Sequence, residues 1–128
     1  MNFNAKILEI TSFEDVSQIK AKADFGEVMA ICLEISPNLN VGDEVKFGFK
    51  SSDVIIALES PKDISAQNIF EAEILDINIG KIVTNIILKS KNFEFSSIIS
   101  SNSAKRLDLQ SGKKVFALIK STSVFLDD

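Results

Sequence analysis

The chain contains one stretch of sequence twice: LNVGDEVKFGFKS at residues 39–51 and LQSGKKVFALIKS at residues 109–121. Each copy has a leucine, a glycine three residues later, a valine three residues after that, and a closing Lys-Ser pair. All five positions are 70 residues apart. A glycine just before an alternating segment indicates a turn that leads into a β-strand. The chain is therefore expected to hold two copies of one β-rich unit.

The repeat extends to both sides of this stretch. A short apolar segment follows each Lys-Ser pair, at residues 54–56 and 124–126. Upstream, AKILEI at residues 5–10 matches AEILDI at residues 72–77 with an offset of 67, so the copies differ by small insertions. Pro61 lies in a turn-rich segment between the copies. These observations predict two domains, residues 1–60 and 61–128.

Strand patterns dominate both copies. Apolar and polar residues alternate at residues 6–10 and 45–49, and β-branched residues are concentrated at residues 83–88. Residues 101–107 differ, because they begin with cap-forming residues and read as a single helical turn. A five-stranded Greek-key barrel is the smallest closed β unit that fits a repeat of roughly 60 residues. An all-β fold with two such units follows.

Composition excludes several classes of function. The net charge is −4, whereas nucleic-acid binders are usually basic, so we expect no nucleic-acid binding by this chain alone. There is no histidine, no cysteine cluster and no glycine-rich phosphate loop, so we expect neither an enzyme nor a site for a bare metal cation. The single cysteine, Cys32, lies in an apolar run and is expected to be a buried, inert thiol. Without a long apolar run or a signal-peptide pattern, the expected location is the cytoplasm, away from membranes.

Three segments of the second half form an ordered set: SAQN at residues 65–68, ISSNSAKRLDL at residues 99–109 and VFALIKSTSV at residues 115–124. They resemble, in the same order, three motifs of the Mop or TOBE (transport-associated oligonucleotide/oligosaccharide-binding) family. Those motifs are Ser-Ala-Arg-Asn, Ile-Thr-x-x-Ser-x-x-x-Leu-Gly-Leu and Val-x-Ala-x-Ile-Lys-Ala-x-x-Val. The first half resembles the same module more faintly, through Lys50 and Ser51.

The resemblance implies two tandem OB-fold-like five-stranded Greek-key barrels, each with at most a short helical turn. It also implies that a tetrahedral oxyanion, molybdate or tungstate, is bound between modules. Carried over by position, the implied oxyanion ligands are Ser65, Gln67, Ser100, Ser103, Lys120 and Ser121.

Two departures from the family pattern bear on this ligand set. Gln67 stands where the family has arginine, so a charge is lost and Lys120 is left with most of the positive charge. The first half lacks its own Ser-Ala-Arg-Asn segment, so we expect one complete ligand set per chain. Lys50 and Ser51 are then candidates for a second or partial site.

The residue types support an anion site independently of the resemblance. A tetrahedral dianion needs several short donors from different directions and at least one positive charge. Serine hydroxyls, backbone N–H groups and a lysine meet that need. Residues 65–70, 96–107 and 115–126 contain no aspartate or glutamate, although the chain has 18 acidic residues.

The leading interpretation is a cytoplasmic binding protein for molybdate or tungstate that acts in storage, buffering or homeostasis without catalysis. The ligand would lie between subunits, so a homo-oligomer is expected, with binding and assembly linked. The alternatives are the ligand-sensing module of a molybdate-responsive regulator or transporter, and an assembly module that has lost its ligand.

Overall fold

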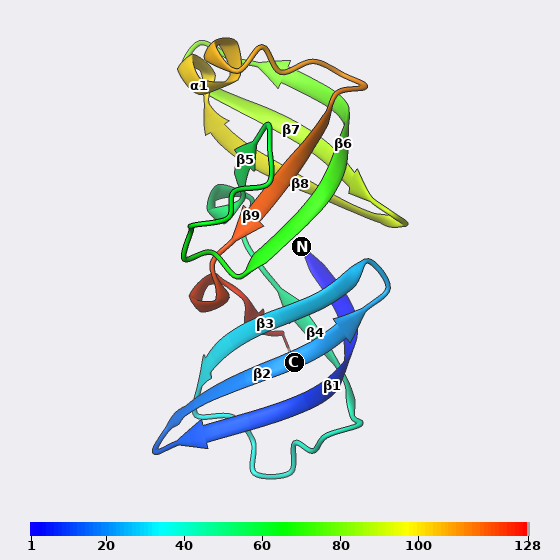
Figure 1. The fold of residues 1–128 in the computed structure, drawn as a ribbon, viewed down its shortest axis with the longest axis vertical. Coiled ribbons are helices and arrows are strands. Elements are labelled where there is room, and N and C mark those ends of the chain that lie inside the picture. Colours follow the sequence, from blue (N-terminus) through cyan, green and yellow to red (C-terminus); the bar gives the residue numbers. More distant parts are fainter. Residues whose placement is uncertain (128) are drawn as a thin grey trace.

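The computed structural model describes residues 1–127 and contains two five-stranded sheets, one above the other in Figure 1. The first repeat supplies β1 (Asn2–Phe13), β2 (Val16–Ala23), β3 (Gly26–Leu33), β4 (Glu44–Gly48), the short 3-10 helix η1 (Ser51–Asp53) and β5 (Ile55–Ala57). The second repeat supplies β6 (Asn68–Ile79), β7 (Val83–Ser90), β8 (Phe93–Ser100), α1 (Ser101–Arg106), β9 (Lys114–Ile119), the 3-10 helix η2 (Ser121–Ser123) and β10 (Phe125–Leu126).

The two sheets exchange their last strands. The first sheet has the order β10-β4-β1-β2-β3 and the second has the order β5-β9-β6-β7-β8. Within each repeat, the fourth strand returns beside the first, which is a Greek-key arrangement. The sequence predicts a division near residue 60, and each sheet takes one edge strand from the other side of it. The chain therefore crosses between the units twice, at η1 and at η2 (Figure 1).

The repeated glycines make the same turn in both units. Gly42 donates its N–H to the carbonyl of Ile7 at 2.8 Å, and Gly112 donates to Ile74 at 2.7 Å. Their φ values are +96° and +89°, a region that residues with a Cβ rarely adopt. The register of the long first strand also shifts at equivalent places, directly after Ile7 and directly after Ile74. Each shift is an irregularity that bends the strand and lets the sheet curl.

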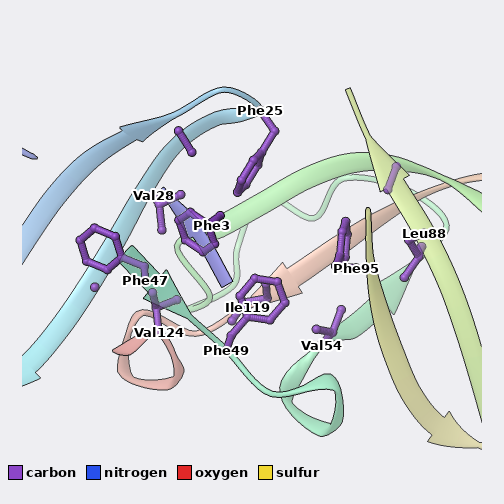
Figure 2. Packing of buried hydrophobic residues seen from close by; sticks show 14 of the residues in the cluster. Phe3, Phe25, Val28, Phe47, Phe49, Val54, Leu88, Phe95, Ile119 and Val124 are labelled. Carbon is purple, nitrogen blue, oxygen red and sulfur yellow. The ribbon is translucent and has the colours of Figure 1, made fainter. Parts of the chain in front are cut away.

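The apolar core runs through both units without a break. Alternate residues of the strands face inward, and Ile7 and Ile74 are 0% exposed at equivalent positions. Phenylalanines from both repeats meet where the units join: the rings of Phe25 and Phe93 stack at a centroid distance of 4.6 Å. Figure 2 shows buried apolar side chains continuing across this junction. The units therefore share one core.

The predicted all-β fold with two five-stranded units is confirmed, and the predicted helical turn at residues 101–107 is the helix α1. Cys32 is buried, as predicted, and burial raises the pKa of its thiol, so the reactive thiolate is disfavoured. Within residues 1–127, no helix has the length and hydrophobicity needed to span a membrane.

Candidate functional site

The six predicted ligand residues fall into two groups. The first, which we call the crossing group, consists of Ser65, Gln67, Lys120 and Ser121. The second, which we call the helix group, consists of Ser100 and Ser103. Each group lies at a different end of the second sheet.

The crossing group lies where β6 begins and β9 ends. Asn68 is paired with Ile119 in the antiparallel ladder, so Gln67 and Lys120 follow as neighbours just beyond its end. Gln67 and Lys120 are exposed, as is Ser65. The fold thus places side by side two segments that are more than 50 residues apart in sequence.

The first unit closes one side of the crossing group. The helix η2, which begins at Ser121, packs against β3, and Ser121 is 7% exposed. Asn68 is 2% exposed. Its side-chain Oδ1 accepts a hydrogen bond from the N–H of Met29 at 2.8 Å, and its Nδ2 donates one to the backbone carbonyl of Met29 at 2.9 Å. Asn68 thus fastens the start of β6 to β3. A groove of about 380 Å³ runs between the two, and Gln67 lines it.

The helix group caps α1. The Ser100 Oγ accepts a hydrogen bond from the N–H of Ser103 at 3.1 Å, which is the usual role of a serine before a helix. The two hydroxyls also lie 3.0 Å apart, and Arg106 Nη2 donates to the Ser103 Oγ at 3.5 Å. Ser100 is exposed and Ser103 is half-buried, so both hydroxyls remain near the surface.

The structure does not bring the two groups together within one chain. Ser100 pairs with Val83 at the end of the sheet where β6 finishes, whereas Lys120 lies where β6 starts. The strand β6 has 12 residues. At about 3.3 Å per residue, the path between its ends is on the order of 35 Å. In Figure 1, α1 lies at the far end of the second unit and η2 lies at the junction of the units.

Lys50 and Ser51 occupy the other crossing, and Ser51 is already engaged. The helix η1, which begins at Ser51, packs against β8. The Oγ atoms of Ser51 and Ser96 are hydrogen-bonded at 2.8 Å. The N–H of Ser96 in turn donates to the Met1 Sδ at 2.9 Å. Of the predicted second or partial site, Ser51 is thus already hydrogen-bonded within the protein, whereas Lys50 is exposed.

The first unit has no equivalent of the helix group. An offset of 67 places Leu33 opposite Ser100 and Ser36 opposite Ser103. The hollow of about 390 Å³ at this end is lined by Ser36 together with Glu14, Asp15 and Glu34. Three carboxylates would repel an oxyanion, because like charges at short range are unfavourable. The first unit is therefore unsuited to bind an anion at this end.

Sequence reasoning did not single out two cations that lie beside the groups. Lys62 lines the groove beside Gln67, and Arg106 contacts Ser103. The spacing of three residues from Ser103 to Arg106 within a helix could have indicated the second contact. Nothing in the local sequence places Lys62, because it precedes β6 in an irregular segment. Within residues 1–127, no cluster of three or more metal-ligating side chains is present.

The second unit and much of the chain are similar in sequence to known proteins. Residues 64–126 match the TOBE domain family. The molybdenum import ATP-binding protein ModC of Rhizobium etli is 37% identical over 87 residues, which cover 67% of this chain and 24% of that protein. The molybdate/tungstate import ATP-binding protein WtpC of Pyrococcus abyssi is 25% identical over 119 residues, covering 92% of this chain and 33% of that protein. The chain thus spans a third or less of these curated relatives.

A solved structure shares the whole fold. The cytoplasmic molybdate-binding protein ModG, with molybdate bound, superimposes with a TM-score of 0.92 at 21% sequence identity. The match covers 98% of this chain and 94% of that one. The two-unit architecture, including both repeats, is therefore that of a known two-domain fold.

Proposed function

The second unit of this chain belongs to the TOBE domain family, and from this premise we propose that the protein binds molybdate or tungstate without catalysing a reaction. Its role would be storage, buffering or homeostasis of the oxyanion in the cytoplasm. The names of the relatives support the ligand, because they are molybdate, tungstate or molybdenum import proteins. The protein that shares the fold is described as cytoplasmic and molybdate-binding.

The chemistry of the crossing group supports the same ligand. A tetrahedral oxyanion carries charge on four oxygens, and each oxygen accepts hydrogen bonds from a different direction. Lys120 supplies a charge, Gln67 an amide donor, and Ser65 and Ser121 hydroxyl donors. Ser121, 7% exposed at the start of η2, would turn its hydroxyl toward the ligand.

The single observation that carries the proposal is that the donors are split between two ends of the second unit. Neither end alone surrounds an ion, so we propose that the helix group of one copy meets the crossing group of another. Ile82 and Val83, beside the helix group, are 80% and 57% exposed. Exposed apolar side chains next to polar ones are typical of a surface that a partner covers. The ligand would then be enclosed between copies of a homo-oligomer, with no nucleic acid or membrane involved.

A second function is favoured by one observation. The curated relatives are ATP-binding import proteins, of which this chain matches about a quarter to a third. The same fold could therefore serve as the ligand-sensing module of a transporter or regulator. In that case, oxyanion binding would change the chain's affinity for a partner protein, whereas a storage protein would bind the ion alone.

The proposal is tested by thermal melts of the purified chain with molybdate, tungstate, sulfate and phosphate at matched ionic strength. Calorimetry or circular dichroism is the suitable readout, because the chain has no Trp or Tyr. A ligand at about 100 times its dissociation constant stabilises a folded protein by roughly 2.7 kcal/mol. We expect a shift with molybdate or tungstate and none with sulfate. The absence of a shift with all four ions would refute oxyanion binding.

A mixing experiment tests the shared site. One variant carries Ser100→Ala and Ser103→Ala, and the other carries Lys120→Ala. Each variant alone is expected to bind molybdate weakly, since every site lacks one group. An equal mixture, unfolded and refolded together, should recover binding at those interfaces where two intact groups meet. If the mixture binds no better than either variant alone, the site is not shared between copies.

A further inference from the structure

The groove beside Gln67 contains three charged side chains, and two of them neutralise each other. Lys20, Glu27 and Lys62 all line the groove. The Lys20 Nζ lies 3.5 Å from the Glu27 Oε1, so this pair contributes no net charge. Lys62 forms no ion pair with any residue in the described range 1–127. The net charge of the groove is therefore that of Lys62.

Gln67 lines the same groove and brings no charge of its own. The proposed ligand is a dianion, and Lys120 beside Gln67 offsets only one of its two charges. A partly enclosed charge without a counter-charge is unfavourable, because the ion loses hydration that nothing replaces. Before a second copy brings its helix group and Arg106, a second cation at the crossing group would offset the other charge of the ion.

The groove is held open by contacts that do not involve Lys62. Asn68 fastens β6 to Met29 of β3 through two hydrogen bonds, and Ala66 is buried beside it. Lys62 itself is exposed and belongs to an irregular segment, so its side chain can reorient toward an ion at low cost. Replacing it should therefore change binding without disturbing the fold.

We propose that Lys62 is the second cation of the oxyanion site and sets its affinity for dianions in place of a charge at position 67. This inference rests on the proposed function, since it names a further residue of the same site. Lys20 does not take this role, because Glu27 holds it and would cancel its charge.

The test measures molybdate affinity by isothermal titration calorimetry on the full chain, with sodium molybdate as the probe. Lys62→Gln is compared with Lys6→Gln, which removes the same charge from an exposed position of β1 that lines none of these grooves. We expect Lys62→Gln to weaken binding by roughly threefold to fivefold, the upper end of the range for an exposed ion pair. Lys6→Gln should change affinity less than twofold.

A rescue variant separates a charge effect from a structural one. Gln67→Arg added to Lys62→Gln returns a cation to the same groove and should restore most of the lost affinity. The loss on Lys62→Gln should also shrink as salt is raised, because screening weakens the attraction.

The outcomes are distinguishable. If the wild-type chain binds no molybdate, the proposed function fails and the role of Lys62 fails with it. If the wild type binds and Lys62→Gln behaves like Lys6→Gln, the proposed function stands and the role of Lys62 is overturned. A loss that Gln67→Arg does not repair would also overturn it, because the charge would not be the cause.

Discussion

The two crossings between the units share a backbone and differ in side chains. At the first, the N–H of Asp53 donates to the carbonyl of Lys50 at 3.0 Å. At the second, the N–H of Ser123 donates to the carbonyl of Lys120 at 2.9 Å. Both lysines have extended backbones, with ψ of 146° and 144°. Each crossing then delivers a short strand to the opposite sheet.

The surroundings of the two crossings are different. Ser51 meets a hydroxyl, that of Ser96, and the Met1 thioether completes the contact. Ser121 faces β3, where the residue equivalent to Ser96 at the offset of 67 is Met29, which has no hydroxyl. The first crossing therefore satisfies its serine within the protein, and the proposed oxyanion donors lie at the second. The two repeats thus keep the same backbone at the crossings, while the side chains that face each crossing serine differ.

The largest expected effect is the loss of stability when an equivalent core residue is shortened in either unit. Ile7→Ala and Ile74→Ala remove equivalent side chains that are 0% exposed. Each should lower the free energy of unfolding by about 2–5 kcal/mol. Because the units share a core and exchange strands, both variants should unfold in one transition, measured by circular dichroism in urea. Two separate transitions would show that the units fold independently.

The next effect contrasts the two crossing lysines. Lys120→Ala should abolish the molybdate-induced stabilisation, which is roughly 2.7 kcal/mol at 100 times the dissociation constant. Lys50→Ala should leave it unchanged, because Ser51 beside it is already engaged. Both lysines are exposed, so the melting temperatures without ligand should match the wild type. Equal losses in the two variants would mean that both crossings bind the ion.

A smaller effect tests how the second crossing is held in place. Asn68→Ala leaves the N–H and carbonyl of Met29 without their partners, which should cost about 1–3 kcal/mol of stability. Asn78→Ala, at an exposed position of the same strand, is the matched control and should change stability by less than about 0.5 kcal/mol. Chemical denaturation measures both. If the two variants lose the same amount, the contact with Met29 does not stabilise the junction.

The smallest effect compares the two crossing serines without ligand. Ser51→Ala removes a hydrogen bond to Ser96 and should cost about 0.5–1.5 kcal/mol. Ser121→Ala removes no hydrogen bond of the described residues, so the apo protein should keep its stability while its molybdate affinity falls. Melts with and without molybdate measure both variants. A loss of apo stability in Ser121→Ala comparable to that in Ser51→Ala would contradict the difference between the crossings.

Much of the local structure was predictable because it depends on neighbouring residues. The alternation of apolar residues predicts the strands. Gly42 and Gly112 predict turns because glycine adopts positive φ at little cost, and both have positive φ in the structure. The serines before residue 104 predict α1, since the Ser100 hydroxyl caps it. The resemblance gave Gln67 and Lys120 as members of one ligand set, and both flank the paired strands β6 and β9.

The arrangement of the site was less predictable. The resemblance supplied six ligand residues as one set, but in one chain they lie at opposite ends of β6. A sequence motif does not record how far apart its residues lie in the folded chain. Lys62 has no local signal at all, because its place beside Gln67 depends on how the first unit packs against the second.

The sequence by itself determined the repeat, the strands, the turns and the single helix, since each follows from side-chain period, glycine or capping over a few residues. Only the tertiary structure decided which sheet receives β5 and β10, and therefore which donors meet at each crossing. The physical reason is that an extended chain after Lys50 or Lys120 can pair with either sheet on local grounds. The shared apolar core at the junction favours the opposite one, because the crossing buries Val54 and Val124 within it.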